Sequence, residues 1–328
     1  MYESARVKTN PYVVGVTGSV AKTTTIAFHE HLLREAGLPV VRFWSKRLTP
    51  LLVQTHYVNR VDEGTGFIVM EYSAYGHDHV AELARTLPPN IAFLTNIYDT
   101  HIGPGQFKDR RDICDSKLRI RPNSVTGYLN QMVLNDLGIE APEGWSPFDV
   151  DQEFIANNPY LPPTLRTAEM QTTGRLLAKE LRIPESVFIN AFETFKPQER
   201  RIIAVTLKDG AKIFFDGDAT YGSRQMSWFE TVNGSTPVMM VEEVNFGDED
   251  LDGQHDLVRK LFESDSTFVL DTEINRSRIP VDINPRYLSA SDFRDRFNRN
   301  KGGYMVYHKA LATRDNSFDP ENYLNRKF

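Results

Sequence analysis

Short apolar runs alternate with stretches of helical periodicity over the first two hundred residues of the chain. The run "YVVGVTG" is rich in β-branched residues and leads through a glycine-containing loop into "KTTTIAFHEHLLREAG", where apolar residues recur at helical spacing until Gly37. The runs "GFIVMEYS" and "NIAFLTNIY" indicate two further buried strands, with a short helix in "HDHVAELARTLPPN" between them. This alternation predicts a mostly parallel sheet with helices on both faces.

The pattern changes near residue 197. Two helices are predicted between Arg166 and Phe195, with Pro184 at the start of the second. The run "RIIAVTLKDGAKIFFDGD" then predicts a hairpin that turns at Asp209 and Gly210, and three more strands are predicted in "TPVMMVEEV", "STFVLDT" and "GGYMVYHK". We therefore expect one α/β domain over residues 1–197 and a smaller α/β domain over residues 198–328.

Composition narrows the class of protein. The 328 residues are 40% hydrophobic, enough for two cores, and the net charge of −6 gives no support for a nucleic-acid surface. The longest apolar runs are strand-length, and no secretory signal is visible, so we expect no membrane span and a cytoplasmic protein. The single cysteine, Cys114, excludes an internal disulfide and is expected to be a small semi-buried residue, not a catalytic one.

Residues 15–25, "GVTGSVAKTTT", join the first strand to the first helix of the pattern. Backbone N–H groups and a helix N-terminus converge in such a loop, and a lysine adds positive charge, which suits phosphate. The parts are present as Gly15, Gly18, Lys22 and Thr23. A strict Walker loop would have glycine where Ala21 and Val16 stand, so an ordinary polar helix start remains the alternative. The alanine matters only if its φ must be positive or its methyl group would meet the phosphate.

The chain resembles the Mur ligases in a series of motifs that follow in the same order: "GVTGSVAKTTT", "VMEYS", "LTNIYDTH", "DSKLRI", "YLN", "FDGDAT" and "VYHKALATR". These ATP-dependent enzymes join amino acids to the peptidoglycan precursor, and folylpolyglutamate synthase is a relative. The resemblance runs from about Tyr12 to Arg314 and implies a central P-loop ATPase domain followed by a Rossmann-like C-terminal domain. It does not include the family's N-terminal domain, which holds the UDP-sugar, so we expect a substrate that is not linked to UDP.

The resemblance implies two Mg²⁺ ions. Glu71 ends a buried run at the carboxyl edge of the expected sheet, where ligands of open α/β folds gather, and is implied to bind one ion together with the Thr23 hydroxyl. An exposed strand-end carboxylate is the alternative for Glu71. The "TNIYDTH" motif implies that His101 binds the second ion. Lys117, in "SKLRI", matches a lysine that is carbamylated in the family, and we hypothesise the same modification here.

The resemblance also implies the contacts to ATP. The loop would contribute Gly18, Ser19, Ala21, Lys22, Thr23 and Thr24. Asn96 would lie near the phosphates, Gln171 near the adenine, and Asp216 in a nucleotide-binding turn, with Arg200 or Arg201 reaching the phosphates. The catalytic set is then Lys22, His101, Lys117, Arg200 and Arg201. The residues after Asp216 depart from the family pattern, and Lys309 matches only the lysine of a late lysine-glycine-serine motif.

Three other stretches have plainer interpretations. His77 and His79 are expected at the polar start of a helix, since the spacing indicates no third metal ligand. The run "KDRR", residues 108–111, is expected to be a solvated face, with contact to an anionic substrate as a minor possibility. The aromatic residues of "RFWSKRLTPLLVQTHYVNR" are expected to pack in the core more readily than to recognise an acceptor.

These features predict an ATP-dependent carboxylate–amine ligase that acts through an acyl phosphate, with small-molecule or peptide acid and amine substrates. Lys22, the arginine and two Mg²⁺ ions would offset the negative charge of the reacting groups. The main alternative is an ATP-binding homologue without ligase activity, a regulatory or partner subunit, which the departures at Ala21 and after Asp216 favour. A phosphotransferase is a third. We expect no nucleic-acid or membrane partner, and the oligomeric state stays open.

Overall fold

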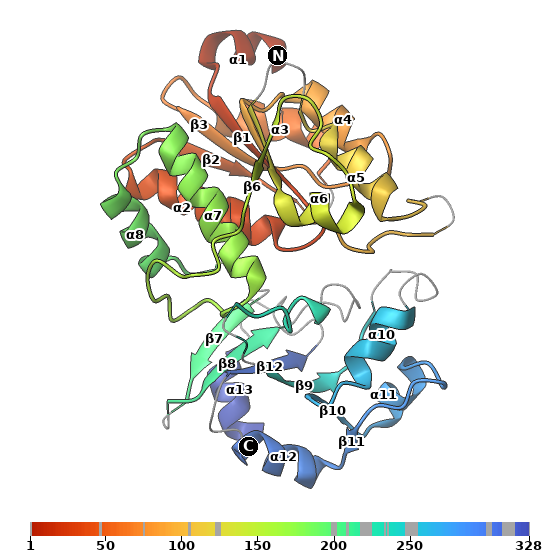
Figure 1. The fold of residues 1–328 in the computed structure, drawn as a ribbon. Helices are drawn as coiled ribbons and strands as arrows, with labels where there is room; N and C mark the ends of the chain where they lie inside the picture. Colours follow the sequence, from red (N-terminus) through yellow and green to blue (C-terminus); the bar gives the residue numbers. More distant parts are fainter. Residues whose placement is uncertain are drawn as a thin grey trace. The chain divides into compact units, whose positions relative to one another are not determined.

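The chain folds into two compact units in a computed structural model (Figure 1). The first unit comprises residues 1–157 and 168–195, and the second comprises residues 158–167 and 196–328. The structure describes residues 2–45, 48–74, 76–103, 106–121, 126–197, 202–207, 210–216, 225–232, 234, 236–246, 255–299, 304–309 and 319–327.

The sheet of the first unit has six strands, all parallel, in the order β2-β3-β1-β4-β5-β6. The strands are β1 (Tyr12–Thr17), β2 (Val40–Phe43), β3 (Phe67–Glu71), β4 (Ile91–Leu94), β5 (Thr126–Asn130) and β6 (Trp145–Phe148). Strand β1 lies between β3 and β4, so the loop that follows it opens at the middle of the carboxyl edge (Figure 1).

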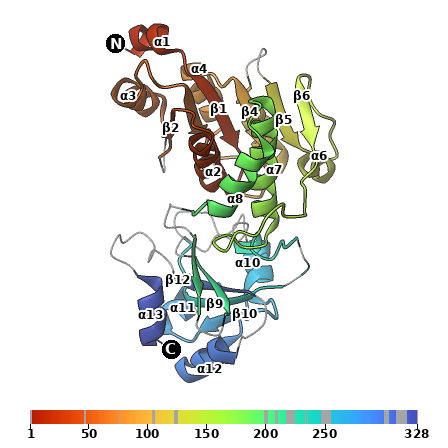
Figure 2. The same ribbon diagram turned by 90° about the vertical axis from the view of Figure 1, so that its left-hand side faces the viewer.

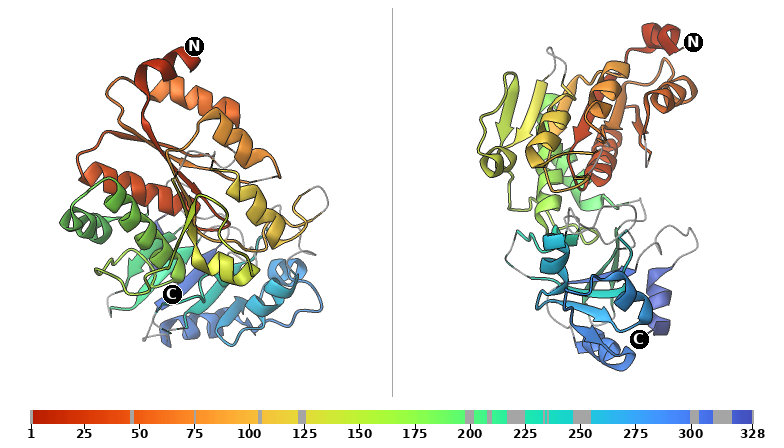
Figure 3. Two further views of the ribbon diagram at one scale, coloured as in Figure 1. Left: turned by 45° about the horizontal axis from the view of Figure 1, so that its top comes forward. Right: turned by 90° about the vertical axis from the view of Figure 1, so that its right-hand side faces the viewer.

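Helices cover both faces of this sheet. One face carries α2 (Lys22–Glu35) and α7 (Leu165–Glu180), with α8 (Glu185–Thr194) against α2. The other carries α3 (Pro50–Arg60), α4 (His79–Thr86), α5 (Arg110–Leu118) and α6 (Gln131–Leu137), and α1 (Tyr2–Thr9) packs on α3. Figure 3 shows the two groups of helices on opposite faces of the sheet. Alternate strand residues supply the two cores: Val14 and Val16 face α2, whereas Val13 faces the other side.

Strand β4 is shorter than the apolar run that predicts it. The strand stops at Leu94, although the run "NIAFLTNIY" continues to Tyr98. Beyond Thr95 the backbone leaves the sheet, and the Asn96 side chain turns toward the loop after β1, where it accepts hydrogen bonds from the backbone N–H groups of Ser19 and Val20. Residues 91–97 of the run are all buried, so apolar character alone could not mark the end of the strand.

The second unit has a mixed six-stranded sheet in the order β11-β10-β9-β12-β8-β7 (Figure 2). Its strands are β7 (Ile202–Thr206), β8 (Lys212–Asp216), β9 (Val238–Glu243), β10 (Thr267–Leu270), β11 (Tyr287–Leu288) and β12 (Tyr304–Lys309). Strands β7 and β8 form the predicted antiparallel hairpin, and the other pairs are parallel. Gly210, with φ 85°, stands at the predicted turn, whereas Asp209 lies outside the described residues.

Helices again cover both faces. The core on one side includes residues of α10 (His255–Phe262) and Ile279, which directly follows α11 (Glu273–Arg278). The core on the other side includes residues of α12 (Ala290–Arg299) and α13 (Pro320–Lys327). The short segment 158–167 belongs to this unit, because Thr164 pairs with Thr231 and Arg166 forms a 2.9 Å ion pair with Glu230. Two α/β domains, the first with a parallel sheet, confirm the predicted fold class. Within the described residues, no helix has the length and apolar character needed to cross a membrane.

Candidate functional site

The loop between β1 and α2 gives the N-terminus of α2 an unusual start. Ala21 is the residue that precedes the helix, and its backbone is left-handed, with φ 61° and ψ 4°. It makes no side-chain capping hydrogen bond. The first backbone N–H groups of any helix lack partners within that helix, and here the residues that carry them are Lys22, Thr23 and the half-buried Thr24. The sequence therefore places a strong anion-binding end at the centre of the sheet edge.

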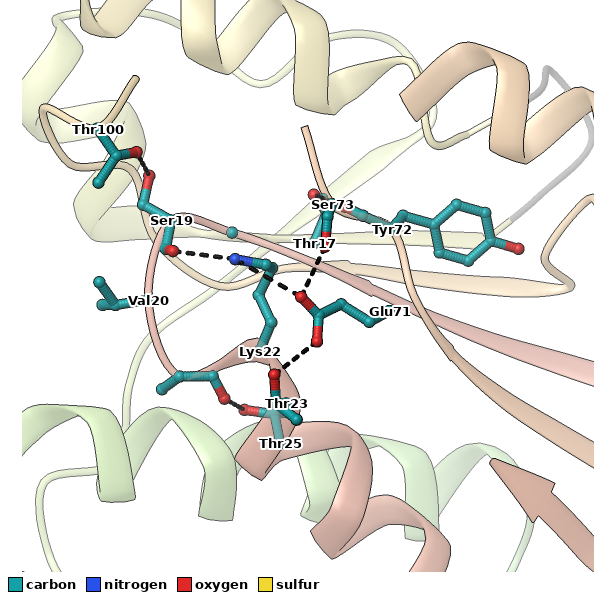
Figure 4. Close-up of polar contacts among 12 residues, drawn as sticks. Thr17, Ser19, Val20, Lys22, Thr23, Thr25, Glu71, Tyr72, Ser73 and Thr100 are labelled. Carbon is teal, nitrogen blue, oxygen red and sulfur yellow. Dashed lines mark hydrogen bonds and ion pairs between the residues drawn. The ribbon is translucent and has the colours of Figure 1, made fainter. Parts of the chain in front are cut away.

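Three side chains converge on Glu71 at the end of β3 (Figure 4). The carboxylate is 8% exposed; one oxygen accepts a 2.6 Å hydrogen bond from the Thr23 hydroxyl, and the other accepts one of 2.6 Å from the Ser73 hydroxyl. The ammonium of Lys22 lies 3.9 Å from Glu71 Oε1 and donates to the carbonyl oxygen of Ser19 at 2.9 Å. A carboxylate, a hydroxyl and an ammonium thus meet beside the start of α2.

Gly18 lets the loop pass close to β4. A Cβ atom built on Gly18 would lie 2.3 Å from the Thr95 hydroxyl oxygen, so any larger residue would displace the loop or the strand end. The carbonyl oxygen of Gly18 accepts a 2.7 Å hydrogen bond from Lys117 Nζ, which is 3% exposed at the end of α5. Burial first, and then the nearby Lys22 ammonium, hold the pKa of Lys117 well below its usual value. The structure thus brings Lys117 to the loop, while its carbamylation and its role as a metal ligand stay predictions.

Asn96 connects the "TNIYDTH" segment to the loop. Its Oδ1 accepts from the backbone N–H of Ser19 at 3.1 Å and from that of Val20 at 2.9 Å. The Ser19 hydroxyl accepts from the N–H of Tyr98 at 2.9 Å and from the Thr100 hydroxyl at 3.4 Å. This segment therefore fixes the conformation of the loop before any ligand binds.

His101 lies in the same segment and has a left-handed backbone, with φ 56°, which is uncommon for a residue with a side chain. Its role as a metal ligand stays a prediction. Among the residues that the structure describes, no three His, Cys, Asp or Glu side chains gather as a metal site would require. Any ion at Glu71 would therefore take hydroxyl, phosphate or water oxygens as further ligands, and these are the ligands that Mg²⁺ prefers.

The remaining predicted contacts lie farther along the chain. Gln171 is fully buried in α7, and its amide bonds at 2.9 Å to the backbone oxygen of Glu153 and to the backbone N–H of Ile155. Asp216 ends β8 in the second unit and accepts 3.0 Å hydrogen bonds from Gln225 and Trp228. Their nucleotide contacts stay predictions. Arg200 and Arg201 lie outside the described residues.

The residues with plainer interpretations have ordinary surroundings. His79 begins α4 and lies 2.8 Å from the Leu48 carbonyl oxygen, while His77 pairs with Asp112 at 3.1 Å. Cys114 is buried, and burial raises the pKa of its thiol to about 12. In the "KDRR" run, Arg110 pairs with Asp99 and Arg111 with Asp115.

Three polar residues of the site were not identified from the sequence: Ser73, Asn130 and Glu169. Ser73 follows Glu71 by two positions, the spacing at which extended residues share a face, and this could have signalled its contact. Glu169 lies four residues before Thr173 and eight before Leu177, on the buried face of α7. A charged residue on the buried face of a predicted helix could have indicated a polar contact at this position.

Comparison with known proteins gives matches in sequence and in fold. Residues 16–137 match the family model described as the Mur ligase middle domain. The UDP-N-acetylmuramoylalanine–D-glutamate ligase of Zymomonas mobilis is 41% identical over 90 residues, which are 27% of this chain and 18% of that enzyme. The enzyme of the same name from Nitratidesulfovibrio vulgaris is 26% identical over 255 residues, covering 76% of this chain and 54% of its own.

Among solved structures, the MurF ligase of Thermotoga maritima in complex with ADP superposes with a TM-score of 0.70 at 17% identity, covering 100% of this chain and 81% of that one. That likeness is one of fold. The matched region spans about half, or less, of the length of these two curated relatives.

Fold and loop together define an α/β protein with a phosphate-type loop at the centre of a parallel sheet. The matches make the class more specific: residues 16–137 of this chain match the middle domain of the Mur ligase family. Its two units have the fold of the MurF ligase of Thermotoga maritima.

Proposed function

We propose that this protein is an ATP-dependent ligase that joins a carboxylic acid to an amine through an acyl phosphate. The observation that supports this most directly is the start of α2, where a helix without a side-chain cap, Lys22 and the Thr23–Glu71 pair lie together. The N–H groups and the ammonium suit the phosphates of ATP, and the hydroxyl–carboxylate pair suits Mg²⁺. The T. maritima MurF ligase, which has this fold, was solved with ADP.

In the proposed reaction an oxygen of the substrate carboxylate attacks the γ-phosphorus, and the bond to the β-phosphate oxygen breaks to release ADP. The amine nitrogen then attacks the acyl carbon, inorganic phosphate leaves, and the nitrogen loses a proton. Lys22 and the first turn of α2 would hold the triphosphate and offset its charge. Thr23 and Glu71 would hold Mg²⁺, which when bound neutralises developing charge on the phosphates.

Further assignments belong to the proposal. His101 would contribute to a second metal site, while Asp216, Gln171 and one of the arginines 200 and 201 would contact ATP. Residues 1–197 and 198–328 would act as ATPase domain and C-terminal domain. We place the reaction in the cytoplasm, with a carboxylic acid and an amine as the substrates.

Carbamylation of Lys117 is also a proposal. The low pKa that burial gives Lys117 favours the neutral amine, the form that adds CO₂ with loss of a proton. The product is an anion that accepts a metal ion, whereas an ammonium would repel one. Electron density of crystals grown with bicarbonate and Mg²⁺ checks this: a plain amine beside an occupied metal site contradicts it.

The central test is the variant Lys22→Ala. Its ADP and phosphate release with Mg²⁺-ATP, measured against pools of acids and amines in all pairings, is expected to fall at least about a hundredfold, because a charge that stabilises the transition state is lost. Circular dichroism should be unchanged, since the Lys22 side chain belongs to neither hydrophobic core of its unit. Lys179→Ala, an exposed lysine on α7, is the matched control and should keep full turnover.

Three outcomes separate the candidate functions. Release that needs both an acid and an amine, with the condensed mass as product, supports the ligase. Nucleotide binding without stimulation by any pair favours the alternative of a homologue without ligase activity. Turnover that needs a single substrate and leaves a phosphorylated product would identify a phosphotransferase, and wild-type turnover in Lys22→Ala would remove the proposal altogether.

A further inference from the structure

A buried carboxylate lies beneath the phosphate loop without belonging to it. Glu169, on α7, is 2% exposed. Its Oε2 accepts a 2.8 Å hydrogen bond from Asn96 Nδ2, and its Oε1 accepts one of 3.1 Å from Asn130 Nδ2. Burying a charged side chain costs free energy unless the group is fully hydrogen-bonded. The packing of α7 alone therefore does not account for a glutamate at this position.

The two ends of the Asn96 amide meet different partners. Its Oδ1 accepts from the backbone N–H groups of Ser19 and Val20. Its Nδ2 donates to Glu169 at 2.8 Å and, at the longer distance of 3.2 Å, to the Val20 carbonyl oxygen and to the Thr95 hydroxyl. An asparagine amide has nearly the same shape when its oxygen and nitrogen exchange places, so shape alone does not decide which end faces the loop. The Glu169 carboxylate, at the shortest distance, and the Val20 carbonyl oxygen only accept hydrogen bonds. Together they take the NH₂ end of the amide and leave its oxygen for the N–H groups of the loop.

Asn130 extends the same arrangement to the neighbouring strand end. Its Nδ2 donates both to Glu169 and, at 2.7 Å, to the carbonyl oxygen of Thr95, while its Oδ1 caps α6 through the N–H of Met132 at 3.0 Å. One carboxylate thus holds the residues that end β4 and β5, and through Asn96 it holds the loop that follows β1.

We propose that Glu169 is a positioning residue for nucleotide binding: by fixing the orientation of the Asn96 amide, it holds the loop residues Ser19 and Val20 in the conformation that presents Lys22 and the start of α2. This inference rests on the proposed function for its nucleotide readout. Glu169 itself touches neither nucleotide nor metal in this account. We infer that its effect reaches the loop through Asn96.

The variant Glu169→Gln keeps the size of the side chain but puts an NH₂ group where an acceptor stood, so one asparagine must lose its partner or flip. Flipping Asn96 would point its NH₂ group at the N–H of Val20. We expect hydrogen exchange of the Val20 amide, followed by NMR in nucleotide-free protein, to become at least about tenfold faster. Ser19 should change less, because its N–H also bonds to the backbone oxygen of Asn96 at 3.0 Å.

Dissociation constants for ADP, measured by calorimetry, should rise about tenfold to a hundredfold in Glu169→Gln. Thr173→Val is the matched control, since it removes a buried 3.2 Å contact between α7 and His29 without touching Asn96. Equal effects of the two variants on Val20 exchange and on ADP affinity would overturn the proposal, because packing of α7 would then explain both.

Adding Asn96→Asp to Glu169→Gln gives a second test. The new carboxylate accepts from the loop and from the glutamine alike, so protection of Val20 should return, and this double variant carries the test if Glu169→Gln alone does not fold. A Val20 amide that stays unprotected in the double variant overturns the proposal. Because exchange is measured without nucleotide, its result stands even if the wild-type protein binds no ADP, a finding that would contradict the proposed function instead.

Discussion

At the scale of single residues, Ala21 stands where a strict Walker loop has glycine, and its backbone shows whether that position needs a positive φ. Ala21 has the left-handed backbone that the loop requires, with φ 61°, a conformation that costs an ordinary residue about 1–2 kcal/mol. The loop keeps its shape all the same, because Asn96 and the Ser19 contacts determine it from outside. Strain that is maintained in this way is typical of functional loops.

Replacing this alanine by glycine should therefore stabilise the protein. Glycine relieves the left-handed strain but has more freedom in the unfolded chain, worth about 0.5–1 kcal/mol, so we expect Ala21→Gly to gain about 0.5–1 kcal/mol in free energy of unfolding. Urea denaturation measures this. The control Ala36→Gly, at a position with φ −78°, should lower the free energy of unfolding. If Ala21→Gly lowers it as well, the left-handed backbone of Ala21 is not strained.

At the scale of elements, the phosphate-loop helix α2 is held from behind by α7 and α8. Phe28 packs edge-on against Phe188 and Phe192 of α8, and the fully buried His29 contacts Thr173 of α7 at 3.2 Å. Burial lowers the pKa of His29 to about 3, so the folded protein holds this imidazole neutral. Acid should therefore weaken the attachment of α2 to α7.

The pH dependence of stability follows from the sign of this shift. Below the usual histidine pKa of about 6.5 the unfolded chain binds a proton at this histidine, whereas folded His29 stays neutral down to about pH 3. The stability of the folded protein therefore falls as the pH falls from about 6.5 to about 3. In His29→Gln the slope of unfolding free energy against pH should decrease by up to about 1.4 kcal/mol per pH unit between pH 6 and 4. Denaturation at several pH values measures it; Thr173→Val keeps the imidazole and should keep the slope.

At the scale of the whole molecule, each unit has its own sheet and its own cores. In the second unit a single carboxylate gathers several partners: Glu242, at the end of β9, accepts from Tyr307, Tyr323, Lys309 and Lys327. Burial would raise the pKa of Glu242, but the two tyrosine hydroxyls and Lys309 outweigh it, and the pKa is lowered. This group of side chains connects β9, β12 and α13. Lys309, which resembles a family motif, therefore has a clear structural role here.

Removing the charge of Glu242 should destabilise the second unit alone. We expect Glu242→Gln to cost about 2–4 kcal/mol, because donors gathered on one carboxylate lose their acceptor. Hydrogen exchange by mass spectrometry should show faster exchange in β9, β12 and α13 and unchanged exchange in β1 and α2. Glu243→Gln is the control, since its ion pair with Arg278 is half-exposed and worth less than about 1 kcal/mol. Equally faster exchange in both units would contradict the expectation that Glu242 stabilises the second unit alone.

Much of the fold could be predicted from the chain because its signals are local. The β-branched run before Gly18, the helical periodicity after Lys22 and the hairpin near Gly210 each lie within a few residues of one another. The order of the motifs along the chain indicated the resemblance to Mur ligases for the same reason, since reading that order does not require knowing which residues meet in space. The strands β2, β5 and β6 were not singled out, because their short runs differ little from loop sequence.

The sequence by itself determined the alternation of strands and helices, the phosphate loop and its lysine, and the resemblance to Mur ligases, since each depends on neighbours along the chain. Only the tertiary structure decided that Ala21 is left-handed, that Ser73 and Thr23 share Glu71, and that Glu169 orients Asn96. Those contacts join residues up to 73 positions apart, and the parallel sheet is what brings its strand ends to one edge. Local pattern carries no information on which distant partners will meet there.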